Sequence, residues 1–289
     1  MGGELMPDYV ALGEPCLVLG YDWERSEDIE LELESFRIVS SVHLEHDVPL
    51  TLFVLGELLE SGEICGLVRQ YLQIEQFRRL VDIAQHSYSH TEFKRLRPDV
   101  CPLDVAEVRT EVRKVNELIL REFEVDCHGI RAPQGHYRGF QGDDDILSVL
   151  CQEGLHYVSS DLRNEHGTFP SEWTDASGRY RQPYFYDRDK FPGLLEIPTQ
   201  GWNDNALKGM SRTTDVKAHS LEEEIEIYQG YANFALQRGL AYAPLFHPWA
   251  IAMTDKRGYV LKSLILYARE HGMQILNYRQ LYDWVIGSA

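Results

Sequence analysis

Basic side chains are scarce in this sequence. Its 289 residues include 28 lysines and arginines against 46 aspartates and glutamates, which gives a formal net charge of -18. Proteins that hold nucleic acid neutralise its phosphates with basic side chains, so we expect no nucleic-acid partner. The same charge repels anionic polymers and favours a neutral or cationic substrate, unless a local basic pocket reverses this preference.

Cysteines and long apolar runs are also scarce. The five cysteines are scattered without a Cys-x-x-Cys spacing, which argues against a zinc ribbon or a redox pair and predicts reduced, mostly buried thiols. No apolar run is long enough to span a bilayer, and the first ten residues lack the basic and apolar regions of a signal peptide. We therefore expect no membrane insertion and a cytoplasmic location.

The composition, with 44% hydrophobic and 26% charged residues, is typical of a globular protein, and we expect a single domain over residues 1–289. Strand-length apolar runs alternate with amphipathic helical segments, which predicts an α/β fold with a mainly parallel sheet or barrel covered by helices. The predicted strands cover residues 16–21, 49–55, 129–133, 155–161 and 240–246. The predicted helices cover residues 26–46, 64–84, 103–123 and 143–152, and a further helix begins after Ser220, its N-cap.

Residues 163–205 lose this helical rhythm and are rich in glycine, proline and aromatic residues. A long irregular segment is usually functional or disordered, and the aromatic content favours ordered hairpins or loops over one face of the molecule. We expect most of its aromatic side chains to pack these loops. Tyr184 and Trp202 from this segment, with Trp249 farther along the chain, are the candidates for contacts to a substrate.

The sequence His86-Ser-Tyr-Ser-His90 carries the strongest functional signal. Two imidazoles four residues apart can lie on one face of a helical turn and bind one divalent metal ion. Taken alone the pair is a weak signal, because any helix brings residues at this spacing together. Its neighbours in the sequence strengthen the metal-site hypothesis.

Titratable side chains also lie at or near the ends of predicted strands, where active sites of parallel α/β proteins form. They are Asp22 with Glu24, Arg131, Asp161 and His247. Alternate residues of a strand share a face, so Asp22 and Glu24 can both point into this edge. Each of these residues alone is more often structural: an aspartate caps a turn, Glu24 can begin the next helix, and His247 can pack in the core. Their occurrence as an ordered set favours function.

This ordered set resembles the polysaccharide deacetylase family, the NodB-homology carbohydrate esterases, including its peptidoglycan deacetylase and allantoinase-like branch. The family's motifs are an aspartate-bearing turn, His-[Ser/Thr]-x-x-His, Arg-x-Pro, a strand-end aspartate and a late histidine. All occur here in order, from about Cys16 to the C-terminus, with Arg131-Ala-Pro-Gln-Gly135 and Leu245-Phe-His-Pro-Trp249 as the third and the last. Two positions depart from the pattern: Asp22-Trp23-Glu24 stands where adjacent aspartates are common, and Gln134 stands where an aromatic residue is usual.

The resemblance implies a distorted (β/α)7-type NodB-homology barrel with parallel strands and one divalent metal ion at the strand ends. Zinc is the first expectation, with cobalt, nickel, iron or manganese as alternatives that the same ligands accept. His86, His90 and Glu24 are the implied metal ligands, with Glu24 in place of the missing second aspartate.

The resemblance also implies a role for each remaining residue in the attack of a metal-activated water on an amide carbonyl. Asp22, held ionised by Arg131, is the expected base, and the backbone N–H of Gln134 is the expected oxyanion donor. His247 is expected to protonate the departing amine, with Asp161 orienting it and favouring its charged form.

These roles predict a hydrolase of a non-peptide carbon–nitrogen bond that removes an N-acetyl, or an N-formyl, group from an amino sugar or oligosaccharide. Two alternatives stay open. One is an allantoinase-like hydrolase of a small cyclic amide, which can dispense with the metal. The other is a degenerate barrel that binds a glycan through its aromatic segment without cleaving it. A homo-oligomer is also left open by the sequence.

Overall fold

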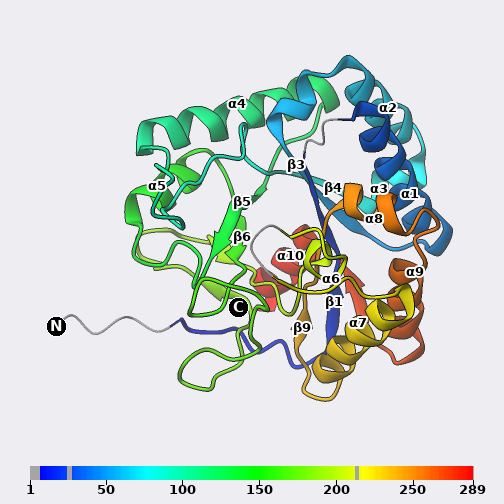
Figure 1. Cartoon of the computed structure of the whole chain (residues 1–289). Coiled ribbons are helices and arrows are strands. Elements are labelled where there is room, and N and C mark those ends of the chain that lie inside the picture. The colour runs from blue at the N-terminus through cyan, green and yellow to red at the C-terminus, as the bar shows by residue number, and fades with distance from the viewer. Residues whose placement is uncertain (1–6, 25–27, 212–214, 289) are drawn as a thin grey trace.

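An eight-stranded, mainly parallel sheet forms the centre of the molecule. The computed structural model describes residues 7–24, 28–211 and 215–288 (Figure 1). The strand order is β10-β2-β3-β4-β5-β6-β8-β7, and among these described strands the β7–β8 pair alone is antiparallel. The strands are β2 (Gly20–Trp23), β3 (Leu50–Val54), β4 (Val81–Gln85), β5 (Gly129–His136), β6 (Tyr157–Asp161), β7 (Tyr184–Phe185), β8 (Leu195–Glu196) and β10 (Leu245–Phe246).

A second, three-stranded parallel sheet continues the first. It has the order β11-β1-β9 and consists of β1 (Cys16–Val18), β9 (Ala241–Tyr242) and β11 (Gln274–Leu276). β1 runs into β2 after Leu19, and β9 is followed closely by β10, so the same two chain segments take part in both sheets. Together the two sheets make a curled, distorted barrel of mostly parallel strands, which confirms the predicted fold class.

Helices cover the outside of the barrel (Figure 1). They are α1 (Ile29–His46), the 3-10 helix η1 (Gly56–Glu60), α2 (Gly62–Leu72), α3 (Glu75–Leu80), α4 (Val105–Phe123), α5 (Asp144–Gln152), α6 (Asp204–Leu207), α7 (Leu221–Leu236), α8 (Pro248–Thr254), α9 (Tyr259–Glu270) and α10 (Tyr278–Ser288). α4 begins with a capping box formed by Asp104 and Glu107, and it buries an apolar stripe that includes Val112 and Val115. Ser220 caps α7 in the same way, as predicted.

Four predicted elements have the wrong extent. The predicted strand over 16–21 is divided into β1 and β2 and continues to Trp23. The predicted helix over 64–84 is divided into α2 and α3 and ends at Leu80, because the next residues form β4 and pair with β3 along its whole length. The helical periodicity of the sequence predicts the first part of this segment correctly, but strand pairing overrides it in the last residues. The predicted strand over 129–133 continues to His136, with a register shift past its proline, and the predicted strand over 240–246 is divided into β9 and β10.

The segment 163–205 is ordered and contains β7, β8 and the first residues of α6. β8 lies parallel to β6, and β7 pairs back onto β8, so this segment supplies one edge of the large sheet. Isolated bridges join Ser171 to Gly201 and Thr174 to Tyr180. The expectation of ordered hairpins and loops is confirmed.

The expectations for cysteines and for membrane spans can also be compared with the structure. All five cysteines are free thiols, and Cys16, Cys65 and Cys127 are buried, as predicted. Over the described stretches of the chain, no helix is both long enough and apolar enough to cross a membrane.

Candidate metal centre

Four parallel strands bring most of the predicted catalytic and ligand residues together near their carboxyl ends. β10, β2, β4 and β5 are parallel and lie within one run of the sheet, so their last residues meet at one edge. Asp22 lies on β2 and Glu24 follows that strand, His86 directly follows β4, and Arg131 lies on β5. His247 follows β10 and is the N-cap residue of α8.

The histidine pair lies in a loop and not on the helical turn that its spacing suggested. β4 ends just before His86, and both Ser87 (φ 62°) and His90 (φ 61°) take the left-handed conformation. The Ser87 hydroxyl accepts a hydrogen bond from the backbone N–H of His90 (3.1 Å). The Glu111 carboxylate on α4 accepts from the backbone N–H of Ser89 (3.2 Å) and from its hydroxyl. These contacts hold the loop with the two imidazole centroids 4.8 Å apart.

Glu24 completes a set of three ligand atoms. Its Oε1 lies 3.2 Å from Nε2 of His86 and 3.1 Å from Nε2 of His90. Ligand atoms placed about 2.0–2.2 Å from a tetrahedral ion are roughly 3.3–3.6 Å apart, so this set needs little adjustment to hold one. His86 directs Nδ1 to the carbonyl oxygen of Arg131 (2.8 Å), an arrangement that leaves Nε2 available to a metal ion. Burial raises the pKa of Glu24, but His90, His247 and hydrogen bonds outweigh burial and hold that pKa well below its usual range.

Asp22 and Arg131 form a buried ion pair beside these ligands. Arg131 donates from Nη1 to Asp22 Oδ1 (2.6 Å), and it also donates to the Tyr278 hydroxyl and to Ser159 Oγ (3.2 Å). Burial lowers the pKa of Arg131, while the Asp22 charge opposes this and the net direction is upward. The second Asp22 oxygen lies 3.9 Å from Nε2 of His86. One carboxylate oxygen is therefore fixed by arginine while the other faces the ligand set.

His247 places Nε2 3.7 Å from Glu24 Oε1 and is held by Asp204, not by Asp161 as predicted. Asp204 lies 2.6 Å from Nδ1 of His247 through one oxygen and accepts its backbone N–H through the other (2.8 Å). Burial lowers the pKa of His247, but the carboxylates of Asp204 and Glu24 outweigh it and raise the pKa to about 9. Asp161 instead pairs with the buried guanidinium of Arg181, so its predicted orienting role is wrong.

The candidate site opens into a pocket of about 920 Å³. Predicted residues that line it are Asp22, Glu24, His86, His90, Gln134, His247 and Trp249. Gln134 takes a left-handed conformation (φ 65°), and its side-chain nitrogen lies 3.4 Å from Nδ1 of His90. Trp202 is half-buried against the hydrophobic core and is not among the described lining residues.

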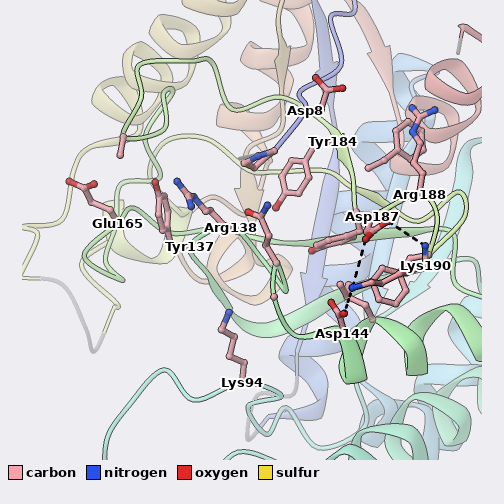
Figure 2. A pocket seen from close by; sticks show the side chains of 18 residues that line it. Asp8, Lys94, Tyr137, Arg138, Asp144, Glu165, Tyr184, Asp187, Arg188 and Lys190 are labelled. Carbon is pink, nitrogen blue, oxygen red and sulfur yellow. Dashed lines mark hydrogen bonds and ion pairs between the residues drawn. The ribbon is translucent and has the colours of Figure 1, made fainter. Parts of the chain in front are cut away.

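Tyr184 lies in a different pocket of about 930 Å³, shown in Figure 2. Several charged residues there pair with one another: Lys190 lies 2.6 Å from Asp144 and 3.8 Å from Asp187. No histidine occurs among the described residues of this lining. The fold therefore places Tyr184 in a different cavity from the histidines, and a contact of Tyr184 with substrate stays a prediction.

Sequence reasoning missed three residues of the candidate site. Asp204 orients His247, Glu111 holds the histidine loop, and Arg163 lines the pocket. An available signal for the first was Asn203-Asp204-Asn205, a polar group at the end of the irregular segment. Glu111 lies within an amphipathic helix, where a glutamate is ordinary, so nothing in its local sequence distinguishes it.

Comparison with known proteins supports the fold. No protein-family model matches the chain, and no curated protein does. Solved structures do match. A protein from Mycobacterium smegmatis assigned as a polysaccharide deacetylase has a TM-score of 0.68 and 18% identity, over 98% of this chain and 94% of that one. Puue allantoinase has a TM-score of 0.65 and 14% identity, over 98% of this chain and 91% of that one.

A third match is a CE4 family pseudoenzyme from Bacillus anthracis, with a TM-score of 0.56 and 14% identity, over 97% of this chain and 70% of that one. At these identities the comparisons establish the fold. The chain has the fold of the polysaccharide deacetylases, which allantoinase shares, and the resemblance drawn from the motifs is confirmed at that level.

Proposed function

We propose that this protein is a metal-dependent hydrolase of a non-peptide carbon–nitrogen bond that removes an N-acetyl group from an amino sugar or a short oligosaccharide. The observation that carries the proposal is the position of Glu24, whose Oε1 lies within 3.2 Å of the Nε2 atoms of both His86 and His90. A buried carboxylate–arginine pair and a buried histidine–carboxylate pair flank this ligand set. A purely structural cluster has no need for two such flanking pairs that face one opening.

His86, His90 and Glu24 are the proposed ligands of one divalent ion. Such an ion supplies Lewis acidity, which polarises an amide carbonyl and makes a water easier to deprotonate. Zinc suits two imidazoles and one carboxylate, and cobalt, nickel, iron and manganese are the alternatives. The chain's own residues supply the proton transfers.

Asp22 accepts the proton of the attacking water through the oxygen that Arg131 does not hold, because the Arg131 guanidinium binds the other oxygen and fixes the orientation of the carboxylate. His247 gives a proton to the departing amine from Nε2, since Asp204 occupies Nδ1 and favours the charged imidazole. Gln134 donates its backbone N–H to the carbonyl oxygen as negative charge develops there. Asp204 replaces Asp161 in this scheme as the residue that positions the acid.

Two other functions are kept as outcomes of the test. The fold similarity to an allantoinase favours a cyclic amide as the second candidate substrate. The fold similarity to a pseudoenzyme favours a binding protein as the third, with substrate contacts such as Trp249 but without turnover. A cytoplasmic location and a single domain stay predictions from the sequence, which leaves a homo-oligomer open.

Metal content and activity should be measured on the same samples. We expect about one divalent ion per wild-type chain by elemental analysis, and loss of both ion and activity in His86→Ala and Glu24→Ala. His271→Ala is the matched control, because this exposed histidine lies outside the ligand set. Amine release from N-acetylated chito-oligosaccharides and opening of allantoin are assayed in parallel.

The outcomes separate the candidates. Amine release that disappears on chelation and returns with zinc supports the deacetylase. Allantoin opening without amine release favours the cyclic amide hydrolase. A wild-type protein that binds no metal after reconstitution with each candidate ion contradicts the proposed mechanism, whatever its substrate.

A further inference from the structure

Arg163 lies in the wall of the histidine pocket, just after β6, and is 5% exposed. Its guanidinium is held by backbone carbonyl oxygens: Nε donates to Gln134 (2.9 Å) and Gly135 (3.1 Å), and Nη1 donates to Gly167 (3.0 Å). The ring of Phe169 lies 4.8 Å from its central carbon. The position of this side chain is therefore fixed by neutral partners.

The charge of Arg163 has no counter-charge in contact with it. No carboxylate in the described part of the chain forms an ion pair with it, and no hydrogen bond to those residues uses Nη2. The neighbouring carboxylate of Glu92 is already bound by Arg97 (2.7 Å). Buried charges in proteins are usually paired, because burial without a counter-charge costs free energy. Burial lowers the pKa of Arg163 to about 10, so it stays protonated at neutral pH.

Arg163 is also close to the reacting centre. Its Nε atom donates to the carbonyl oxygen of Gln134, and the side-chain nitrogen of the same glutamine lies 3.4 Å from His90. Among the other charged residues that line the pocket, Asp28 caps the N-terminus of α1 and Arg97 is paired. A cation without an ion-pair partner among the described residues thus lines the pocket beside the proposed oxyanion donor.

We propose that Arg163 binds an anionic group of the substrate, a carboxylate or a phosphate, that lies within a few bonds of the scissile amide. This inference rests on the proposed function, because it places the amide at the histidine pocket. It reverses locally the preference for a neutral or cationic substrate that the net charge suggests. A guanidinium offers two donors in a plane that match such an anion, and its rigid backbone contacts reduce the entropy lost on binding.

Three N-acetylated sugars test the proposal. N-acetylglucosamine is neutral. N-acetylmuramic acid adds a lactyl ether, which bears a carboxylate, at the carbon next to the N-acetyl position, and N-acetylglucosamine 1-phosphate adds a phosphate at the other neighbouring carbon. Dissociation constants for the zinc-loaded protein are measured by calorimetry. We expect the wild type to bind one or both anionic sugars about 10- to 100-fold more tightly than the neutral one, the range of a charge-assisted hydrogen bond.

The Arg163→Gln variant should lose this preference while its affinity for the neutral sugar stays within about threefold. Arg113→Gln is the matched control, because it removes the same charge from an exposed residue of α4 that pairs with Glu153 outside the pocket. Should Arg163→Gln fail to fold, Arg163→Lys keeps the charge but not the planar pair of donors, and its preference should fall to an intermediate value.

Three results overturn the proposal: equal or tighter binding of the neutral sugar by the wild type, a preference that persists in Arg163→Gln, or an equal loss for all three sugars, which indicates a purely structural arginine. Lack of measurable binding of both anionic sugars at millimolar concentration also counts against it. Hydrolysis is followed separately. If binding shows the preference and no sugar is hydrolysed, the proposed function fails and the anion site stands.

Discussion

The ion pair between Asp22 and Arg131 should contribute far more to stability than a surface pair of the same length. Its N–O distance is 2.6 Å, and the two side chains are 4% and 0% exposed. Removal of one partner leaves a buried charge without compensation, which typically costs about 3–5 kcal/mol of the free energy of unfolding. Arg131→Met and Asp22→Leu should each lower the free energy of unfolding by an amount in this range.

The double variant should lose much less free energy of unfolding than the two single variants lose in sum, because it leaves no unpaired charge. We expect a coupling free energy of about 2–3 kcal/mol between the two positions. Arg131→Met also removes the contact of the guanidinium with the Phe53 ring at 4.2 Å, a loss that appears in the single and in the double variant and so cancels in the cycle.

Urea denaturation of the metal-free protein, with a chelator present, measures all four free energies. The slope of the free energy of unfolding against urea concentration must agree among the variants for the comparison to hold. Arg69 and Glu122 provide the control cycle, since they are also 2.6 Å apart but 48% and 18% exposed, and their coupling should stay below about 1 kcal/mol. The predicted coupling is refuted if the losses in free energy of unfolding of the two single variants sum, within about 0.5 kcal/mol, to the loss of the double variant.

Three further predictions use other parts of the molecule. Asp204→Asn should lower kcat about 100-fold with little change in KM, because His247 loses its orienting carboxylate; an unchanged kcat in steady-state assays contradicts this role. Burial lowers the folded-state pKa of His43 from 6.5 to about 4, so the neutral imidazole stabilises the fold fully above pH 6.5. As pH falls toward 4, the free energy of unfolding should drop by about 3 kcal/mol. In His43→Gln, urea denaturation measured across this pH range should not show that drop. Gly129→Ala should lower the melting temperature, because its new Cβ would lie 1.9 Å from a buried tyrosine ring, whereas Gly66→Ala on α2 meets nothing within 4 Å and should raise it slightly.

The order of elements and the edge that carries the site follow from the sequence, because both depend on local patterns. Alternating apolar runs and amphipathic segments predict parallel strands with helices between them, and titratable residues at strand ends then meet at one edge. Asp22, His86, Arg131 and His247 meet there. The end of a helix is harder to predict, since the residues of β4 fit a helical pattern until their pairing with two neighbouring strands is known.

The local geometry of the histidine loop was not accessible from the sequence. A spacing of four residues is compatible with a helical turn and with a loop that bends back on itself. The loop is selected by the left-handed conformations at Ser87 and His90 and by the carboxylate of Glu111, which comes from a helix about twenty residues farther along the chain. Both geometries bring the two imidazoles together, so the pair lies close as predicted although the predicted helical turn is wrong.

The partner of His247 shows why strand ends alone do not complete the site. Asp161 satisfies the strand-end rule, but the guanidinium of Arg181 binds it. Asp204 precedes His247 by 43 residues and belongs to the short helix α6, which the irregular segment delivers to the pocket. The same segment delivers Arg163. The strand ends and the loops that follow them therefore carry the proposed metal ligands and the proposed base, whereas the irregular segment carries Asp204, which holds His247, and Arg163, the proposed contact to the rest of the substrate. Because the second set comes from a different segment than the strand ends and loops that carry the ligand set, changes in the irregular segment can alter which amide is accepted while the ligand set stays in place.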